Sequence, residues 1–216
     1  MDKEKILAAC DHTILGVDAK WEDVKQVLDD GIKYNVASVC ISPVWVERAR
    51  AYAKDLKITT VIGFPSGCTT TASKVFETKD AIEKGADEID MVIHVGALKD
   101  GDDEYVLNEI NAIKEACGDH ILKVIVETCL LTEEEKVRVT KIVSKSNADF
   151  IKTSTGFSTG GATFEDVKIF ADNVSNGTLI KAAGGISSLD DGEKFLELGA
   201  SRLGTSRIVK AVKAME

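Results

Sequence analysis

The chain has 216 residues, of which 44% are hydrophobic and 29% are charged, and this balance is typical of a globular protein with one well-buried core. We therefore expect one domain over residues 1–216. The net charge of −9 at pH 7, with basic residues dispersed among more numerous acids, argues against nucleic acid as a partner. The chain contains no run of eighteen apolar residues that could span a bilayer, so neither export nor a membrane partner is indicated.

Short β-type runs alternate along the chain with longer stretches in which apolar residues recur at three- and four-residue spacing. A short amphipathic helix over residues 3–9 is expected first. Eight strands are then predicted, over residues 12–15, 37–41, 59–62, 88–93, 121–126, 150–152, 179–182 and 202–204. The clearest crossover helices are predicted over residues 21–34, 73–84, 104–117, 133–146 and 189–198.

A four-residue pattern recurs just before every second predicted strand. Its members begin at Asn35, Gly85, Asn147 and Gly199, and each closes a helical stretch. Glycine and asparagine are the residues that a left-handed helix C-cap favours. The spacings of 50, 62 and 52 residues correspond to two βα units each time.

Eight βα units with parallel strands close most naturally into a barrel, because the crossovers share one hand and cover both faces of the sheet. The expected fold is therefore α/β, a single-domain (β/α)8 TIM barrel with an extra N-terminal helix. The alternative is an open doubly wound sheet, which needs a G-x-G-x-x-G fingerprint after its first strand. Only Gly16, Val17 and Asp18 follow that strand, so we favour the barrel.

Two lysines stand at the ends of short apolar runs, Phe150-Ile151-Lys152 and Leu179-Ile180-Lys181, and small residues follow each one at once. A buried ammonium group is costly unless the site uses it, so the pair indicates amine chemistry. Neighbouring lysines repel each other's protons, and one can then be a free nucleophilic amine near neutral pH, as a Schiff base requires. These residues alone leave open which lysine is the nucleophile.

Polar residues at the C-terminal ends of the strands are the further candidates, because barrel enzymes carry their chemistry there. If Asp90 on strand four and Lys123 and Glu127 on strand five point inward, the barrel mouth holds three lysines and at least two carboxylates. Taken singly, Lys123 and Glu127 are interpreted as structural charges, whereas Lys152 and Lys181 together are interpreted as functional. The other candidates at strand ends are Asp11, Thr13 and Cys40.

Two glycine-bearing loops predict a phosphate site. Gly184 and Gly185 follow strand seven, and Gly204 and Ser206 lie at the end of strand eight, where barrels often bind phosphate through backbone N–H groups. Glycine lets the backbone approach a ligand closely, and Ser206 can donate a hydroxyl. Arg207 either adds positive charge to this site or faces water.

The cysteines and histidines indicate neither disulfides nor metal. Five cysteines without a C-x-x-C spacing favour reduced thiols, and hence a cytoplasmic location. Cys40 and Cys129 are interpreted as packing residues rather than nucleophiles. The three histidines lack the spacing of a zinc motif, so no metal is expected. His94 follows Asp90 closely and either relays a proton or packs at a loop mouth, and packing is the favoured interpretation.

Eight segments in order resemble the deoxyribose-phosphate aldolase family of class I aldolases. They are residues 11–15 (DHTIL), 39–43 (VCISP), 61–65 (VIGFP), 88–93 (EIDMVI), 123–128 (KVIVET), 152–157 (KTSTGF), 181–185 (KAAGG) and 204–206 (GTS). The resemblance runs from the first predicted strand to the last. It implies reversible cleavage of 2-deoxyribose 5-phosphate to acetaldehyde and glyceraldehyde 3-phosphate on a (β/α)8 barrel, with no metal or organic cofactor.

The resemblance also implies a role for each matched residue. Lys152 would form the Schiff base, Lys181 would be the cation that lowers its pKa, and Asp90 would move protons through a water. Substrate-site residues would be Asp11, Thr13, Leu15, Cys40, Lys123 and Thr155, of which Lys123 would support Asp90. The phosphate loops would contain Gly156, Gly184, Gly185, Gly204 and Ser206. The partners would be phosphorylated sugars and aldehydes, and the assembly a homodimer.

Three features depart from the family pattern. Ala183 and Arg207 stand where other residues are common, so the phosphate geometry is expected to differ slightly. The chain ends at Glu216 without the tyrosine-bearing tail of some members, which is expected to affect turnover. Two alternative functions remain open, another sugar-phosphate lyase or isomerase on the same barrel and a catalytically silent phosphosugar-binding protein.

Overall fold

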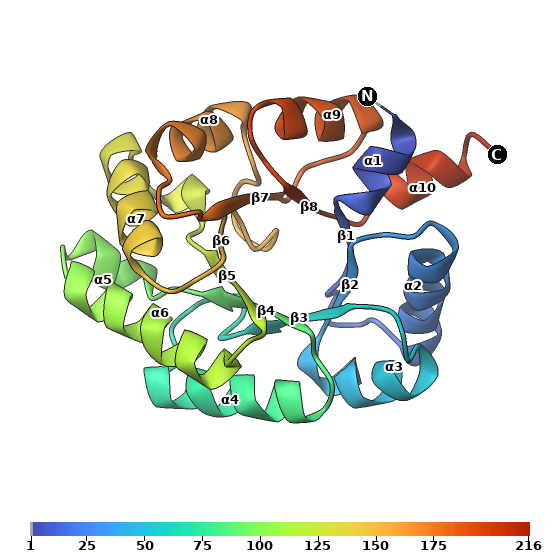
Figure 1. Ribbon diagram of the computed structural model, residues 1–216, viewed down its shortest axis with the longest axis horizontal. Coiled ribbons are helices and arrows are strands. Elements are labelled where there is room, and N and C mark those ends of the chain that lie inside the picture. The colour runs from blue at the N-terminus through green and yellow to red at the C-terminus, as the bar shows by residue number, and fades with distance from the viewer. Residues whose placement is uncertain (1) are drawn as a thin grey trace.

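The computed structural model describes residues 2–216 and has a closed barrel of eight parallel strands at its centre. The strands are β1 (Cys10–Ile14), β2 (Ser38–Ile41), β3 (Ile58–Ile62), β4 (Glu88–Val92), β5 (Ile121–Ile125), β6 (Phe150–Lys152), β7 (Leu179–Ala183) and β8 (Arg202–Thr205). Each strand pairs with its neighbours in chain order, and β8 pairs with β1 to close the ring (Figure 1). The predicted (β/α)8 barrel is confirmed, because an open sheet would leave β1 and β8 apart.

Helices surround the barrel on its outer side (Figure 1). They are α1 (Lys3–Ala8), α2 (Trp21–Lys33), α3 (Val46–Tyr52), α4 (Thr71–Glu83), α5 (Val95–Lys99), α6 (Asp103–Cys117), α7 (Glu133–Lys145), α8 (Phe164–Asn173), α9 (Leu189–Glu197) and α10 (Ile208–Lys213), with 3-10 turns η1 (Pro43–Trp45) and η2 (Thr128–Leu130). The extra N-terminal helix is α1. Within residues 2–216, no helix is both long enough and apolar enough to cross a membrane.

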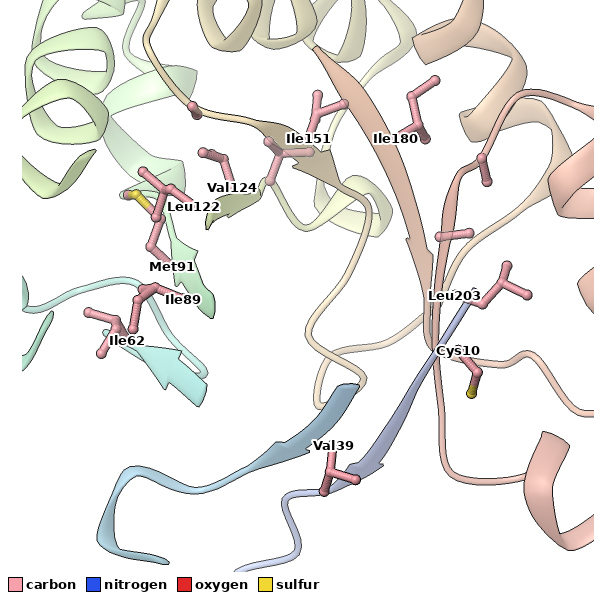
Figure 2. Packing of buried hydrophobic residues seen from close by; sticks show 14 of the residues in the cluster. Cys10, Val39, Ile62, Ile89, Met91, Leu122, Val124, Ile151, Ile180 and Leu203 are labelled. Atoms are coloured by element: carbon pink, nitrogen blue, oxygen red, sulfur yellow. The ribbon is translucent and has the colours of Figure 1, made fainter. Parts of the chain in front are cut away.

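The hydrophobic core lies between the barrel and the helices rather than inside the barrel. Figure 2 shows apolar side chains on the outer face of the strands, including Ile89 and Met91 of β4 and Leu122 and Val124 of β5. Because side chains alternate along a strand, the intervening residues of β4 and β5 face the barrel interior. In β4 these residues include Asp90, so burying the apolar layer directs the charged residues toward the barrel axis.

The predicted helix caps before the even-numbered strands are confirmed at three of four positions. Asn35, Gly85 and Gly199 have φ angles of 49°, 105° and 109°, in the left-handed region. The prediction is wrong at Asn147. There α7 ends through Ser146, which is extended with φ −76° and ψ 175°, and the Asn147 N–H donates instead to Asn111 Oδ1 at 3.1 Å. A side-chain acceptor from α6 thus replaces the left-handed cap.

Candidate active site

Lys152 and Lys181 lie side by side because their strands are in register. The two residues are Cα partners on β6 and β7, so their side chains leave the same face of the sheet. Lys152 Nζ lies 2.7 Å from Asp90 Oδ2, and Lys181 Nζ lies 2.7 Å from the same oxygen. Lys152 is only 4% exposed and Lys181 is fully buried. The predicted pair of strand-end lysines therefore shares one carboxylate oxygen inside the barrel.

A layer of charged residues supports this group from inside the barrel. Lys123 Nζ contacts Asp90 Oδ1 at 2.8 Å and Glu88 Oε2 at 2.6 Å. Lys181 Nζ also lies 2.5 Å from Asp11 Oδ2. The three lysines and at least two carboxylates expected at the barrel mouth are thus brought together.

Arg202 is a member of this layer that the sequence analysis did not single out. Its guanidinium bridges Asp11 Oδ1 at 2.7 Å and Glu88 Oε2 at 3.0 Å. Arg202 is the Cα partner of Lys181, since β7 and β8 are neighbours. Its inward position at the start of β8 was the only sequence signal that could have identified it.

The charges of the layer balance when Lys152 is neutral. Three carboxylates, of Asp11, Glu88 and Asp90, face three cations, of Lys123, Lys181 and Arg202. A protonated Lys152 would add a fourth positive charge to this largely buried group. Burying an unbalanced charge is costly, so the arrangement favours the free amine at this position.

The surroundings of the two lysines shift their pKa values in opposite directions. Burial and the adjacent Lys181 cation lower the pKa of Lys152, against the opposing influence of Asp90. Burial alone would lower the pKa of Lys181 too, but the carboxylates of Asp11 and Asp90 outweigh it and raise that pKa. These shifts favour Lys152 over Lys181 as the free amine, a distinction that the strand pattern could not make.

Asp90 stays ionised although it is buried. Burial opposes ionisation, but Lys123, Lys152 and Lys181 hold the pKa of Asp90 well below its usual range. An ionised carboxylate with two oxygens directed at different lysines can accept and return protons next to an amine nucleophile.

A cavity of about 400 Å³ opens above Lys152 at the C-terminal ends of the strands. The predicted phosphate residues all line it, together with Thr13 near the end of β1 and Leu15 just after that strand. Its walls are formed by Thr13, Ile14, Leu15, Gly16, Thr155, Gly156, Phe157, Ala183, Gly184, Gly185, Ile186, Gly204, Thr205, Ser206 and Arg207. Arg207 is exposed at the edge of the cavity, where its charge faces both the site and water.

Three predicted substrate residues lie beneath the cavity instead of on its wall. Asp11, Cys40 and Lys123 are buried inside the barrel and support the residues above them. Burial raises the pKa of the Cys40 thiol to about 11, which agrees with the interpretation of Cys40 as a packing residue. Thr155 does line the cavity, but its hydroxyl donates to Glu127.

Two glycines make room for the site. A Cβ atom on Gly204 would lie 3.1 Å from Cε of Lys181 and 2.9 Å from Cβ of Ala183, so the absent side chain leaves space for the lysine. Gly161, which the sequence analysis did not single out, packs so closely against Gly184 that a Cβ there would lie 2.5 Å from the Gly184 carbonyl. The loop after β6 thereby supports the loop after β7.

His94 packs at a loop and does not relay protons to Asp90. Its Nδ1 accepts a hydrogen bond from the Ala97 N–H at 2.9 Å and caps α5. Its ring lies edge-on to Tyr105, with centroids 5.9 Å apart. The packing interpretation of His94 is thus confirmed.

The fold and these side chains define a class I aldolase, a barrel enzyme whose buried lysine amine forms a Schiff base. The chain belongs to the DeoC/LacD family of aldolases, whose family model matches residues 5–201.

Named relatives agree with this family assignment. The chain is 58% identical over 214 residues to deoxyribose-phosphate aldolases of Streptococcus agalactiae and Streptococcus pyogenes, covering 99% of this chain and 96% of each relative. A candidate deoxyribose-phosphate aldolase from Coccidioides immitis superposes with a TM-score of 0.95 at 36% identity, over 100% of this chain and 87% of that one. Deoxyribose phosphate aldolase from Aeropyrum pernix, described as tetrameric, superposes with a TM-score of 0.90 at 29% identity, over 99% and 92%.

Proposed function

We propose that this protein is a deoxyribose-phosphate aldolase, which cleaves 2-deoxy-D-ribose 5-phosphate reversibly to acetaldehyde and D-glyceraldehyde 3-phosphate. The observation that carries the proposal is the oxygen of Asp90 that lies 2.7 Å from the amino groups of both Lys152 and Lys181. The 58% identity to named relatives over nearly the whole chain supports the same activity.

Lys152 begins the reaction as the nucleophile. Its free amine attacks the aldehyde carbon of the open-chain sugar, and loss of water from the carbinolamine gives an iminium ion. Lys181 stays protonated beside it and lowers the pKa of the amine. Asp90, which is ionised and next to Lys152, moves protons through a water during these steps.

The iminium ion then acts as the electron sink for cleavage of the carbon–carbon bond. The hydroxyl on C3 loses its proton, the C2–C3 bond breaks, and glyceraldehyde 3-phosphate leaves while an enamine remains on Lys152. Protonation of the enamine at C2 and hydrolysis release acetaldehyde and the free lysine. Every step uses groups of the chain and water, and no metal or organic cofactor is required.

The phosphate of the substrate is held at the far end of the cavity by the loops after β6, β7 and β8. Gly156, Gly184, Gly185, Gly204 and Ser206 line the cavity. Asp191 holds the β7 loop in place, since its carboxylate accepts hydrogen bonds from the backbone N–H groups of Ser187 at 3.0 Å and Ser188 at 3.1 Å. Such a preformed loop leaves other backbone N–H groups available to an anion.

A cytoplasmic homodimer is the proposed state of the protein. The five thiols are free, as in a reducing compartment. The homodimer rests on the family resemblance, and the tetramer of the Aeropyrum pernix relative is an assembly of the same fold. Sedimentation should give twice the mass of one chain, and a monomer or tetramer would contradict this assignment.

Product analysis tests the activity directly. The purified protein incubated with 2-deoxyribose 5-phosphate should release acetaldehyde and glyceraldehyde 3-phosphate in equal amounts, and Lys152→Leu should abolish this release while leaving the fold intact. A panel of other phosphorylated aldehydes and ketoses serves as the control. Turnover of one of these in preference to the deoxypentose phosphate would assign a different sugar-phosphate lyase or isomerase. Binding without turnover would indicate a silent phosphosugar-binding protein.

A further inference from the structure

Glu127, two residues after the end of β5, has a backbone conformation that its side chain does not favour. Its φ and ψ angles are 55° and 65°, in the left-handed region. Among residues 2–216, the only other non-glycine residues with positive φ are Asn35 and Asn176, and asparagine tolerates this region well. Glutamate has no such tolerance, so its surroundings must hold it there, and such residues cluster at functional sites.

Because of this conformation, the Glu127 side chain does not continue the inward and outward alternation of side chains along β5. It is directed toward the loop after β6. The Glu127 carboxylate is buried, and Oε1 accepts the Thr155 N–H at 3.2 Å while Oε2 accepts the Thr155 hydroxyl. The Thr155 hydroxyl oxygen in turn accepts the Phe157 N–H at 3.0 Å. The carboxylate therefore holds Thr155 at the start of the turn formed by residues 155–157, and the Thr155 hydroxyl holds Phe157 at its end.

This turn forms one wall of the cavity above Lys152. Thr155, Gly156 and Phe157 all line it, and Gly156 lies next to Gly184 of the loop after β7, where a Cβ on Gly184 would lie 3.6 Å from Gly156 Cα. Both hydrogen-bond donors of Thr155 are directed to Glu127, so Thr155 has no donor left for a phosphate oxygen. Thr155 can then contribute to anion binding only through the shape that it gives the turn, whose central residue is Gly156, with φ 84°.

We infer that Glu127 is a positioning residue for the phosphate end of the substrate, acting through Thr155 without touching the reacting atoms. The inference rests on the proposed function, because it concerns the phosphate loops of that same site. It differs from a general structural role, since loss of the carboxylate should affect binding of the phosphate group and leave the amine of Lys152 unaffected.

Two measurements on Glu127→Gln separate these roles. Calorimetric titration with glycerol 3-phosphate, which has no carbonyl group to react, should show a rise in Kd of about tenfold, the loss expected for disturbing a hydrogen bond to a charged group. The rate at which acetaldehyde and cyanoborohydride modify Lys152 should stay within about twofold of wild type, because that chemistry does not involve the turn. Glu133→Gln, on the exposed surface of α7, is the matched control and should change neither quantity.

Variants of Thr155 test whether the effect passes through this residue, even if Glu127→Gln folds poorly. Thr155→Val removes the hydroxyl and should weaken binding of glycerol 3-phosphate by a similar factor, whereas Thr155→Ser should restore it. The double variant Glu127→Gln/Thr155→Val should be no weaker than either single variant, since both break one linkage.

Each other outcome overturns the inference. Unchanged binding by Glu127→Gln, or equal losses of binding and of Lys152 modification, would show that Glu127 does not act selectively on the phosphate. Failure of the wild-type protein to bind glycerol 3-phosphate would also overturn it. The wild-type protein could also bind glycerol 3-phosphate in a Glu127-dependent way and yet fail to cleave 2-deoxyribose 5-phosphate. That result would overturn only the proposed function.

Discussion

Lys152 and Lys181 differ in what surrounds their amino groups, although both donate to Asp90 Oδ2. Lys181 has a second carboxylate partner, Asp11, at 2.5 Å, whereas Asp90 is the only carboxylate that pairs with Lys152 within residues 2–216. Burial lowers the pKa of Lys152, whereas the carboxylates of Asp11 and Asp90 raise the pKa of Lys181. The pair was predictable from the two strand ends. Which of the two lysines is the free amine depends on Asp11, which lies 141 positions before Lys152 and reaches the site only when the barrel closes.

The influence of Lys181 on Lys152 predicts a pH effect. Lys181→Met removes the cation that helps to lower the pKa of Lys152, so that pKa should rise. The free amine is the reactive form, and the rising limb of kcat/KM against pH should therefore move to higher pH, with a strong loss of activity at neutral pH. Lys168→Met, at an exposed lysine of α8, is the control. A pH–rate profile identical to that of the wild type would exclude this role for Lys181.

At the level of elements, the strands were the most predictable part of the chain. All eight were identified, because each is a short apolar or alternating run bounded by turn residues, and their ends shifted by two residues at most. The helices α3, α5, α8 and α10 were not given bounds in advance, and α3, α5 and α10 have only seven, five and six residues and give little periodic signal. Glu127 was placed on the inward face of its strand, but its left-handed backbone directs it to Thr155 instead.

The contact between α4 and α6 contains a fully buried ion pair that the sequence analysis missed. Lys74 Nζ lies 2.8 Å from Glu109 Oε1 and also donates to the Val92 carbonyl at 2.8 Å, at the end of β4. Glu109 Oε2 accepts the His94 N–H at 3.1 Å. On each helix alone these residues look like ordinary charged surface positions, and only the packing of the two helices over β4 buries them. The pair therefore fixes the strand that carries Asp90.

Removing one member of this pair should destabilise the protein strongly. Lys74→Met leaves the Glu109 carboxylate buried without its cation, and the free energy of unfolding should fall by about 3–5 kcal/mol. Urea unfolding followed by circular dichroism measures the change. Lys74→Met/Glu109→Gln should recover part of the loss, because it removes the uncompensated charge. A midpoint for Lys74→Met equal to that of Lys168→Met, which alters only an exposed pair, would contradict this account.

The molecule has an apolar interior and a charged interior, and the two are separated by the wall of the barrel. Apolar side chains fill the layer between the barrel and the helices (Figure 2), whereas paired charges fill the barrel interior around Asp90. The alternation along β4 and β5 predicted this separation, because one face of each strand is apolar. The partners within the interior could not be predicted, since they come from strands far apart in the sequence. Arg202 and Glu88, which lie 114 positions apart, are an example.

The charged interior makes the stability of the molecule dependent on pH. Burial opposes ionisation of Asp11 and Asp90, but the surrounding cations outweigh it and lower the pKa of both carboxyls in the folded state. The two ionised carboxylates therefore stabilise the folded protein at pH values above their unfolded pKa of about 3.9. This stabilisation is lost as the pH falls through the folded-state pKa values. His12, whose pKa burial lowers, should add a smaller loss below its unfolded value of about 6.5. The urea midpoint should therefore fall steeply below about pH 4. A midpoint that stays constant down to about pH 3 would contradict a charged interior.

The central claim is that the Lys152 amine, buried and uncharged beside a cationic neighbour, forms a covalent bond with the aldehyde. Reductive trapping tests it most directly: the protein is treated with acetaldehyde and cyanoborohydride, its intact mass is measured, and the modified peptide is sequenced by mass spectrometry. The account predicts rapid addition of a single ethyl group, located on Lys152, with Lys181 unmodified. An adduct on Lys181, or modification no faster than that of exposed surface lysines, would contradict it.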